Sequence, residues 1–154
     1  MKRWVILAPL AFLVACSGGS PVQSVAPTPE TIAFLQIDPA ALRSCVDVES
    51  LVVGGIAGLI TGSEDAALAS AAQTGLQRCG ETAQLIDVAG RPPEERPRAE
   101  ACQRAFAAKA AAYTAVNQAL AADGDFMAVQ EGTRAFIAGI RESTPQMRAC
   151  NTPS

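Results

Sequence analysis

The sequence contains no histidine, and this limits the catalytic and metal-binding chemistry that its residues could perform. Without imidazole there is no His-based triad, no His proton shuttle and no imidazole metal ligand. The chain has a lysine at position 109 that lies on the same side of its expected helix as Phe106 and Tyr113. A catalytic lysine would need a serine nucleophile, and no serine spacing around it forms such a motif. We expect instead a snorkelling or ion-paired Lys109, with Glu49 in a core position opposite it.

Carboxylates are the other candidate acids and bases, and Glu49 and Glu131 are the ones that an enzyme would use. No paired-carboxylate spacing accompanies either of them. The formal net charge of −3 leaves no electrostatic footprint for nucleic acid. We therefore expect no catalytic residue, no cofactor and no nucleic-acid partner.

Four cysteines, Cys45, Cys79, Cys102 and Cys150, have a spacing that suits disulfides in a helical bundle. In an antiparallel hairpin, residues equally far from the turn lie level, so all four fall near one layer. We favour Cys45 with Cys79 and Cys102 with Cys150. Cys79 with Cys102 and Cys45 with Cys150 is the other pairing that fits. A four-thiolate zinc site is disfavoured because no C-x-x-C spacing occurs, so no metal is expected.

The fifth cysteine follows an N-terminal export signal. Lys2 and Arg3 precede an uncharged stretch over residues 4–15, which is the layout of a secretory signal peptide. Leu13-Val14-Ala15-Cys16 then resembles the lipobox of bacterial lipoproteins. That resemblance implies removal of residues 1–15 and attachment of diacylglycerol and a further acyl chain, typically palmitate, to Cys16.

The same resemblance implies a location. Position 17 is serine, whereas an aspartate after the lipidated cysteine marks inner-membrane retention in Gram-negative lipoproteins. We expect an outer-membrane lipoprotein that faces the periplasm, with the cell surface as the alternative face. Two or three acyl chains would hold it firmly, since each buried CH₂ contributes about 0.8 kcal/mol. The mature chain, with ten basic and fifteen acidic residues, is too anionic to bind an anionic membrane by charge.

The mature chain divides into a spacer and one domain. Residues 16–30 comprise the lipidated cysteine and a flexible stretch rich in Gly, Ser and Pro. Residues 31–154 form the helical domain, and the apolar run over residues 32–37 reads as an extended or helical lead-in that covers one end of a bundle. The charged segment 91–100 reads as a solvated loop and the first turn of a helix.

Four long helices are expected in the alanine-rich remainder, since apolar residues recur there at intervals of three and four. Asp38-Pro39 and Asp125 are start signals, while Gly62, Gly90 and Pro145 are stop or kink signals. The fold class is therefore all-α, as an antiparallel four-helix bundle or two helical hairpins stapled by disulfides. The expected core stripes include Val53 on the first long helix and Phe126 on the last. The Gly54-x-x-x-Gly58-x-x-x-Gly62 spacing resembles a glycine zipper over nine residues, and we expect it to pack closely on the next, alanine-rich helix.

These features favour a lipid-anchored, non-enzymatic periplasmic module that binds a protein partner or supports an envelope assembly. The alternative is a carrier of a small apolar ligand or lipid in the bundle interior. Such a carrier would line its cavity with the aromatic side chains Phe34, Phe106, Tyr113, Phe126 and Phe136.

Overall fold

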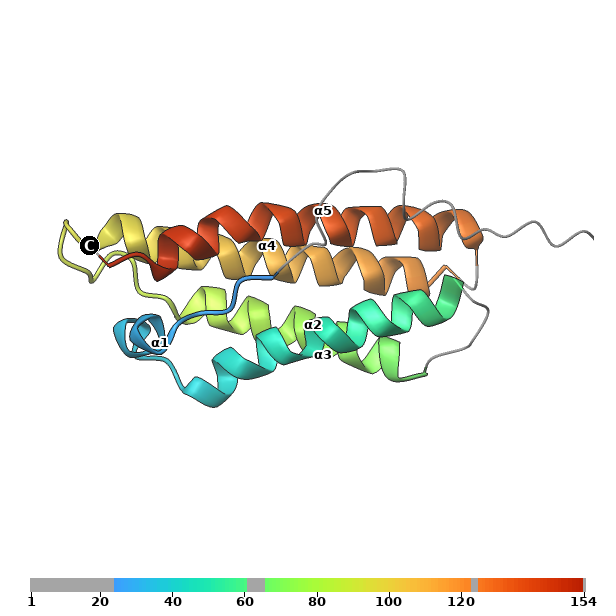
Figure 1. Ribbon diagram of the computed structural model, residues 1–154, viewed down its shortest axis with the longest axis horizontal. Helices are drawn as coiled ribbons and strands as arrows, with labels where there is room; N and C mark the ends of the chain where they lie inside the picture. The colour runs from blue at the N-terminus through green and yellow to red at the C-terminus, as the bar shows by residue number, and fades with distance from the viewer. Residues whose placement is uncertain (1–23, 61–65, 123–124, 154) are drawn as a thin grey trace, which may run out of the picture.

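The computed structural model describes residues 24–60, 66–122 and 125–153, and these form five helices. The helices are α1 (Pro29–Leu35), α2 (Pro39–Ile60), α3 (Ala66–Leu85), α4 (Arg96–Leu120) and α5 (Phe126–Asn151). The four long helices run antiparallel, with the α2–α3 hairpin beside the α4–α5 hairpin, and α1 lies across one end (Figure 1). The all-α antiparallel bundle predicted from the periodicity is confirmed. The signal peptide, Cys16 and the Gly62 turn lie outside the described residues.

The two ends of the bundle differ, and we name them for what covers them. The α1 end holds α1, the start of α2 and α4, and the last turns of α3 and α5. The far end is formed by the last turns of α2 and α4 and the first turns of α3 and α5 (Figure 1).

Both disulfides follow the favoured pairing. Cys45 is bonded to Cys79 and joins α2 to α3, while Cys102 is bonded to Cys150 and joins α4 to α5. Each bond therefore closes one hairpin, and all four cysteines are fully buried in the half of the bundle nearer the α1 end. The alternative pairing is excluded, and a zinc site on these cysteines is excluded with it, because the disulfides leave no thiolate among them.

The helix starts follow from capping residues. Asp38 Oδ1 accepts a hydrogen bond from the backbone N–H of Ala40 at 3.0 Å, at the start of α2. Asp125 Oδ1 does the same for Met127 at 2.9 Å, at the start of α5. Both caps were predicted, because an aspartate oxygen satisfies an N–H that has no partner inside the helix.

Pro145 does not end α5, which continues to Asn151. Of the two outcomes expected at Pro145, a helix end or a kink, the helix end is therefore wrong. The reason lies in the residues beyond it, since Met147 and Cys150 are both fully buried and Cys150 is covalently bonded to α4. Tertiary contacts hold these turns although proline cannot donate the usual backbone hydrogen bond.

Two expected core residues are exposed. Val53 is 54% exposed, because Val52 and Ile56 occupy the inward face of α2. Phe126 is 69% exposed, because it is the first residue of α5 and lies at the far end, where few side chains are available to cover it.

The close packing expected of the glycine zipper is absent at Gly54. A methyl group added at Gly54 would meet no atom within 4 Å, so Gly54 does not mediate a close helix contact. Close approach occurs instead between α4 and α5, where a methyl group at Gly139 would lie 2.8 Å from Cβ of Ala112. At Gly132 it would lie 2.9 Å from the carbonyl oxygen of Ala115. Small residues do bring two helices together, but in the second hairpin.

The folded region begins earlier than expected. Residues 24–30 were assigned to a flexible spacer, but α1 starts at Pro29, and Val25 packs against the core. The run over residues 32–37, expected as an extended or helical lead-in, is helical as far as Leu35 and lies at the end of the bundle. Among the described helices, none combines the length and apolar character that a membrane crossing requires.

Candidate functional site

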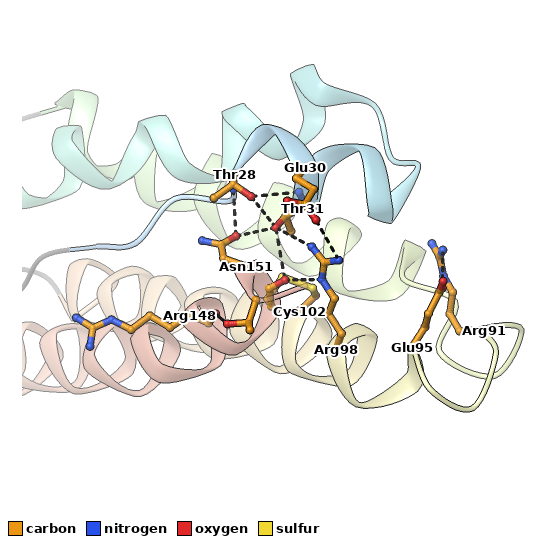
Figure 2. Close-up of polar contacts among 11 residues, drawn as sticks. Thr28, Glu30, Thr31, Arg91, Glu95, Arg98, Cys102, Arg148 and Asn151 are labelled. Atoms are coloured by element: carbon orange, nitrogen blue, oxygen red, sulfur yellow. Dashed lines mark hydrogen bonds and ion pairs between the residues drawn. A yellow bond between two sulfur atoms is a disulfide. The ribbon is translucent and has the colours of Figure 1, made fainter. Parts of the chain in front are cut away.

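A buried arginine fastens α1 to the bundle. Arg98, in the first turns of α4, donates through Nε to the carbonyl oxygen of Cys150 at 2.9 Å and through Nη2 to Thr31 Oγ1 at 3.4 Å (Figure 2). Its side chain is 8% exposed and lies 3.9 Å from the carboxylate of Glu30. One guanidinium therefore joins α1, α4 and the last turn of α5, using donors held in one plane.

Asn151 completes this contact from the C-terminal side. Its Oδ1 accepts from the backbone N–H of Thr28 at 3.0 Å and from Thr31 Oγ1 at 2.9 Å. Its Nδ2 donates to the carbonyl oxygen of Ala26 at 2.8 Å. Every polar atom of this amide is thus used to bind residues 26–31, and the two ends of the domain are tied together (Figure 2).

The ring of Phe34 contacts two arginines. The guanidinium of Arg98 is 4.2 Å from the centre of the Phe34 ring, and that of Arg91 is 4.6 Å from it. Such cation–π contacts contribute about 0.5–1 kcal/mol at exposed sites and more when water is excluded. We call the contacts of Arg91, Arg98 and Asn151 with residues 26–35 the α1 clasp.

The second disulfide supports the clasp directly. Cys102 follows Arg98 by one helical turn, and its bonded partner Cys150 supplies the carbonyl oxygen that Arg98 binds. Thr31 Oγ1 lies 3.4 Å from the same oxygen. Fixing Cys150 to α4 therefore fixes the acceptor around which the clasp is built.

A second buried cation lies on the same side of α4, eleven residues after Arg98. Lys109 is fully buried, and its Nζ lies 2.6 Å from Glu49 Oε2 and donates to Ser24 Oγ at 2.8 Å. Ser24 Oγ in turn donates to Glu49 Oε2 at 2.8 Å. The predicted contact between Lys109 and Glu49 is confirmed, and a serine that sequence reasoning missed joins it.

The Ser24, Lys109 and Glu49 side chains form a compact triangle, which raises the question of catalysis. A base that activates a serine accepts the proton of its hydroxyl, whereas here Lys109 Nζ donates to Ser24 Oγ and that hydroxyl donates to Glu49. The arrangement is better suited to hold the N-terminal segment on α4. Glu131, the other candidate acid or base, is an exposed residue of α5.

The bundle interior near this triangle is filled by Tyr113. A methyl group at Gly75 would lie 2.7 Å from the Tyr113 ring, so the ring occupies the space that a side chain on α3 would need. The hydroxyl donates to the carbonyl oxygen of Cys45 at 3.4 Å. Burial, and then the charge of Glu49, raise the pKa of Tyr113 well above its usual value.

A cavity of about 610 Å³ opens at the α1 end, and we call it the end pocket. One wall is the end of α1 with the α1–α2 connection (residues 35–38) and Ala41 of α2. The other is Leu85 at the end of α3, with Asp87 and residues 90–92 after it. Arg91 joins the two sides by donating to the carbonyl oxygen of Leu35 at 3.3 Å. Because Leu35 belongs to α1, the α1 clasp helps to build this pocket.

The sequence patterns therefore predicted only some of the contacts described here. Cys45, Cys79, Cys102 and Cys150 are paired as favoured, and Glu49 meets Lys109. Segment 91–100 is not wholly solvated, because Arg98 is only 9% exposed. Among the described residues, no group of three or more His, Cys, Asp or Glu side chains could hold a metal ion. Comparisons with protein families, with curated proteins and with solved structures gave no significant match.

Proposed function

We propose that this chain is a lipid-anchored, non-enzymatic helical module of the bacterial envelope, which binds a protein partner or supports an envelope assembly. The observation that carries the proposal is the docking of residues 24–35 on α4 through Lys109 and Arg98. The lipobox cysteine lies eight residues before Ser24. A fully extended chain covers at most about 29 Å over that length, so an acyl anchor on Cys16 would keep the bundle close to the membrane.

The sequence pattern favours an outer-membrane lipoprotein facing the periplasm. Leu13-Val14-Ala15-Cys16 fits the lipobox at each position, and Ser17 replaces the aspartate typical of inner-membrane retention. Two disulfides are compatible with an oxidising compartment. The buried triangle supports a non-enzymatic role, because Lys109 is paired with Glu49 and donates to Ser24, so it is not placed as a base for that serine.

A carrier of apolar ligands is less well supported. Phe106, Tyr113 and Phe136 are buried in the core, with the Tyr113 and Phe136 ring centres 5.6 Å apart. Phe126 is exposed at the far end, and none of the five expected aromatic residues lines the end pocket. Phe106, Tyr113 and Phe136 therefore fill the interior in which a carrier would need space.

The anchor is tested by Cys16→Ser in cells labelled with a fatty acid. The expected result is unprocessed precursor without acyl label, while the wild-type chain is labelled and sediments with outer membranes. Cys102→Ser is the matched control for loss of a cysteine, and it should still be labelled. Normal processing and labelling of the Cys16→Ser chain would overturn the proposal.

The partner is tested by cross-linking in intact cells with the lipidated wild-type protein and with a form directed to the periplasm by a non-lipoprotein signal peptide. A specific envelope protein, linked to the anchored form and confirmed with purified components, supports the proposal. Absence of any specific product argues against a partner.

A further inference from the structure

The end pocket extends the proposed function, and the inference drawn from it rests on the partner-binding role proposed above. Residues 24–35 run from the level of Lys109 to the level of Arg98, so the chain enters the domain midway along α4 and proceeds toward the α1 end. The end pocket therefore lies beyond the point where the tethered chain enters the fold.

The walls of the pocket are fixed by hydrogen bonds. On one side, Asp87 Oδ1 accepts from the backbone N–H of Gly90 at 2.8 Å. Arg96 donates to the carbonyl oxygens of Ala89 and Arg91, at 3.4 and 3.0 Å. On the other side, Gln36 adopts a left-handed conformation with φ of 56°, which turns the chain from α1 into α2. A ligand would meet a preformed site and would not have to order these turns.

The charge available to a ligand is negative. Asp38 and Asp87 both line the pocket, and within the described part of the chain neither has a cation within 4 Å. Each spends one carboxylate oxygen on a backbone N–H, at Ala40 and at Gly90. The second oxygen of each is the acceptor that a cationic ligand would use.

The one cation of the lining is already engaged. Arg91 Nη1 is 3.6 Å from Glu95, its Nη2 donates to Leu35, and its guanidinium covers the Phe34 ring. An anionic ligand would have to compete with these contacts. A cationic ligand would find two carboxylates in the lining that have no ion-pair partner among the described residues.

Part of the pocket lining is apolar. Leu85, the last residue of α3, is 63% exposed, and it lies with Ile37, Ala41 and Pro92 in the lining. An exposed leucine beside two carboxylates matches a ligand that presents a cationic side chain next to an aliphatic one. Aliphatic contact then contributes through area removed from water, while the aspartates select the charge.

We propose that the end pocket binds a segment of a partner protein in which an arginine or lysine is flanked by aliphatic residues. The guanidinium or ammonium group binds Asp38 and Asp87, and the aliphatic neighbours cover Leu85 and Pro92. The partner approaches the α1 end of the bundle, which lies beyond the docked N-terminal segment.

The test uses the mature lipoprotein in detergent micelles and a dye-labelled tripeptide, acetyl-Leu-Arg-Leu-amide, with protein-free micelles as the blank. Fluorescence anisotropy should show saturable binding of this peptide and none of the Leu-Glu-Leu counterpart. Equal binding of both peptides, or no binding of either, overturns the proposal.

Variants then locate the binding. Asp38→Asn together with Asp87→Asn keeps both acceptors of the backbone hydrogen bonds and should weaken binding about five- to tenfold. The control, Asp47→Asn with Glu142→Gln, removes the same charge from two exposed positions elsewhere and should leave affinity unchanged. An equal loss in both double variants would show general charge attraction and would refute the site.

The apolar part has a closely matched control. Leu85→Ser should weaken binding severalfold, whereas Leu51→Ser, at a leucine of similar exposure (61%), should not. An equal effect of the two substitutions counts against the pocket. Because peptide binding does not need the acyl chain, failure of this test is distinct from failure of the lipid anchor, which is read from acyl labelling of Cys16.

Discussion

The α1 end and the far end of the bundle are held together in different ways. At the α1 end, two disulfides and the α1 clasp fix the helices by covalent and directional contacts. Toward the far end, α4 and α5 approach closely through Gly132 and Gly139, while Phe126 and Met127 remain exposed. An alanine-rich interior buries little apolar area per residue. One end therefore depends on bonds with defined partners, and the other depends on the fit of small side chains.

The distribution of charge follows the same division. The segments 51–60, 66–77 and 110–120, which lead to the far end in α2, α3 and α4, contain no charged residue. Most arginines, including Arg91, Arg96 and Arg98, lie toward the α1 end. Hydrogen bonds and ion pairs to charged groups specify geometry, whereas contacts among alanines specify only distance. The lesson is that structural specificity is concentrated where the N-terminal segment docks.

The largest effect is expected between the two ends, at the buried ion pair. Glu49→Gln should lower the free energy of unfolding by about 3–5 kcal/mol, because it leaves the ammonium of Lys109 buried without its counter-ion. Urea denaturation followed by circular dichroism measures this. Adding Lys109→Met should recover most of the loss, and a double variant no more stable than Glu49→Gln would contradict this explanation.

Removing each disulfide in turn should have different local effects in the two hairpins. Cys102→Ala with Cys150→Ala should cost about 2–4 kcal/mol and should also increase hydrogen exchange over residues 24–35, because the carbonyl of Cys150 is no longer fixed to α4. Cys45→Ala with Cys79→Ala should cost a similar amount without that local increase. The comparison fails if both pairs raise exchange in residues 24–35 equally.

Two glycines test the fit toward the far end. Gly139→Ala should destabilise the protein by about 1–3 kcal/mol, because the new methyl group would press on Ala112. Gly54→Ala should instead be neutral or stabilise by up to about 1 kcal/mol, since the site is open and alanine favours helix. The midpoint temperatures of thermal unfolding of the two variants test this prediction. Equal shifts of the midpoint would show that α4 and α5 can move apart to accommodate the methyl group.

The smallest effect near neutral pH concerns Tyr113. Its pKa is raised by burial and by Glu49, so the folded protein keeps the phenol neutral while an unfolded chain ionises it above about pH 10. Stability should be unaffected below that pH and should fall above it by up to about 1.4 kcal/mol per pH unit. Tyr113→Phe should remove this component of the alkaline loss. Since this is the one tyrosine of the sequence, tyrosinate absorbance reports it directly.

Much of the fold could be predicted because it depends on local patterns. Apolar periodicity and the caps Asp38 and Asp125 located the long helices, and hairpin symmetry favoured the correct disulfides. The apolar periodicity gave a wrong prediction at Val53, because Val52, one residue earlier, occupies the inward face of α2. It also failed at Gly54, because small residues permit close packing without specifying which helix uses it.

The α1 clasp could not be predicted in the same way. Arg98 lies in a densely charged segment that resembles a solvated loop, and only its contact with the carbonyl oxygen of Cys150 shows why it is buried. Ser24 belongs to a stretch rich in Gly, Ser and Pro, and it meets Lys109 across 85 residues of sequence. Contacts of this range depend on the completed tertiary structure, which local pattern does not contain.

The entry of the chain at Ser24 also has a mechanical consequence. If the chain is anchored at Cys16 as proposed, tension along it would reach the described domain first at Ser24 and would pass from there to Lys109 in the middle of α4. α4 is covalently joined to α5 through Cys102, so a cross-linked pair of helices takes the load. Among the described residues, the Ser24 contact would therefore bear such a load before the contacts of Thr28 and Thr31 and before the end pocket.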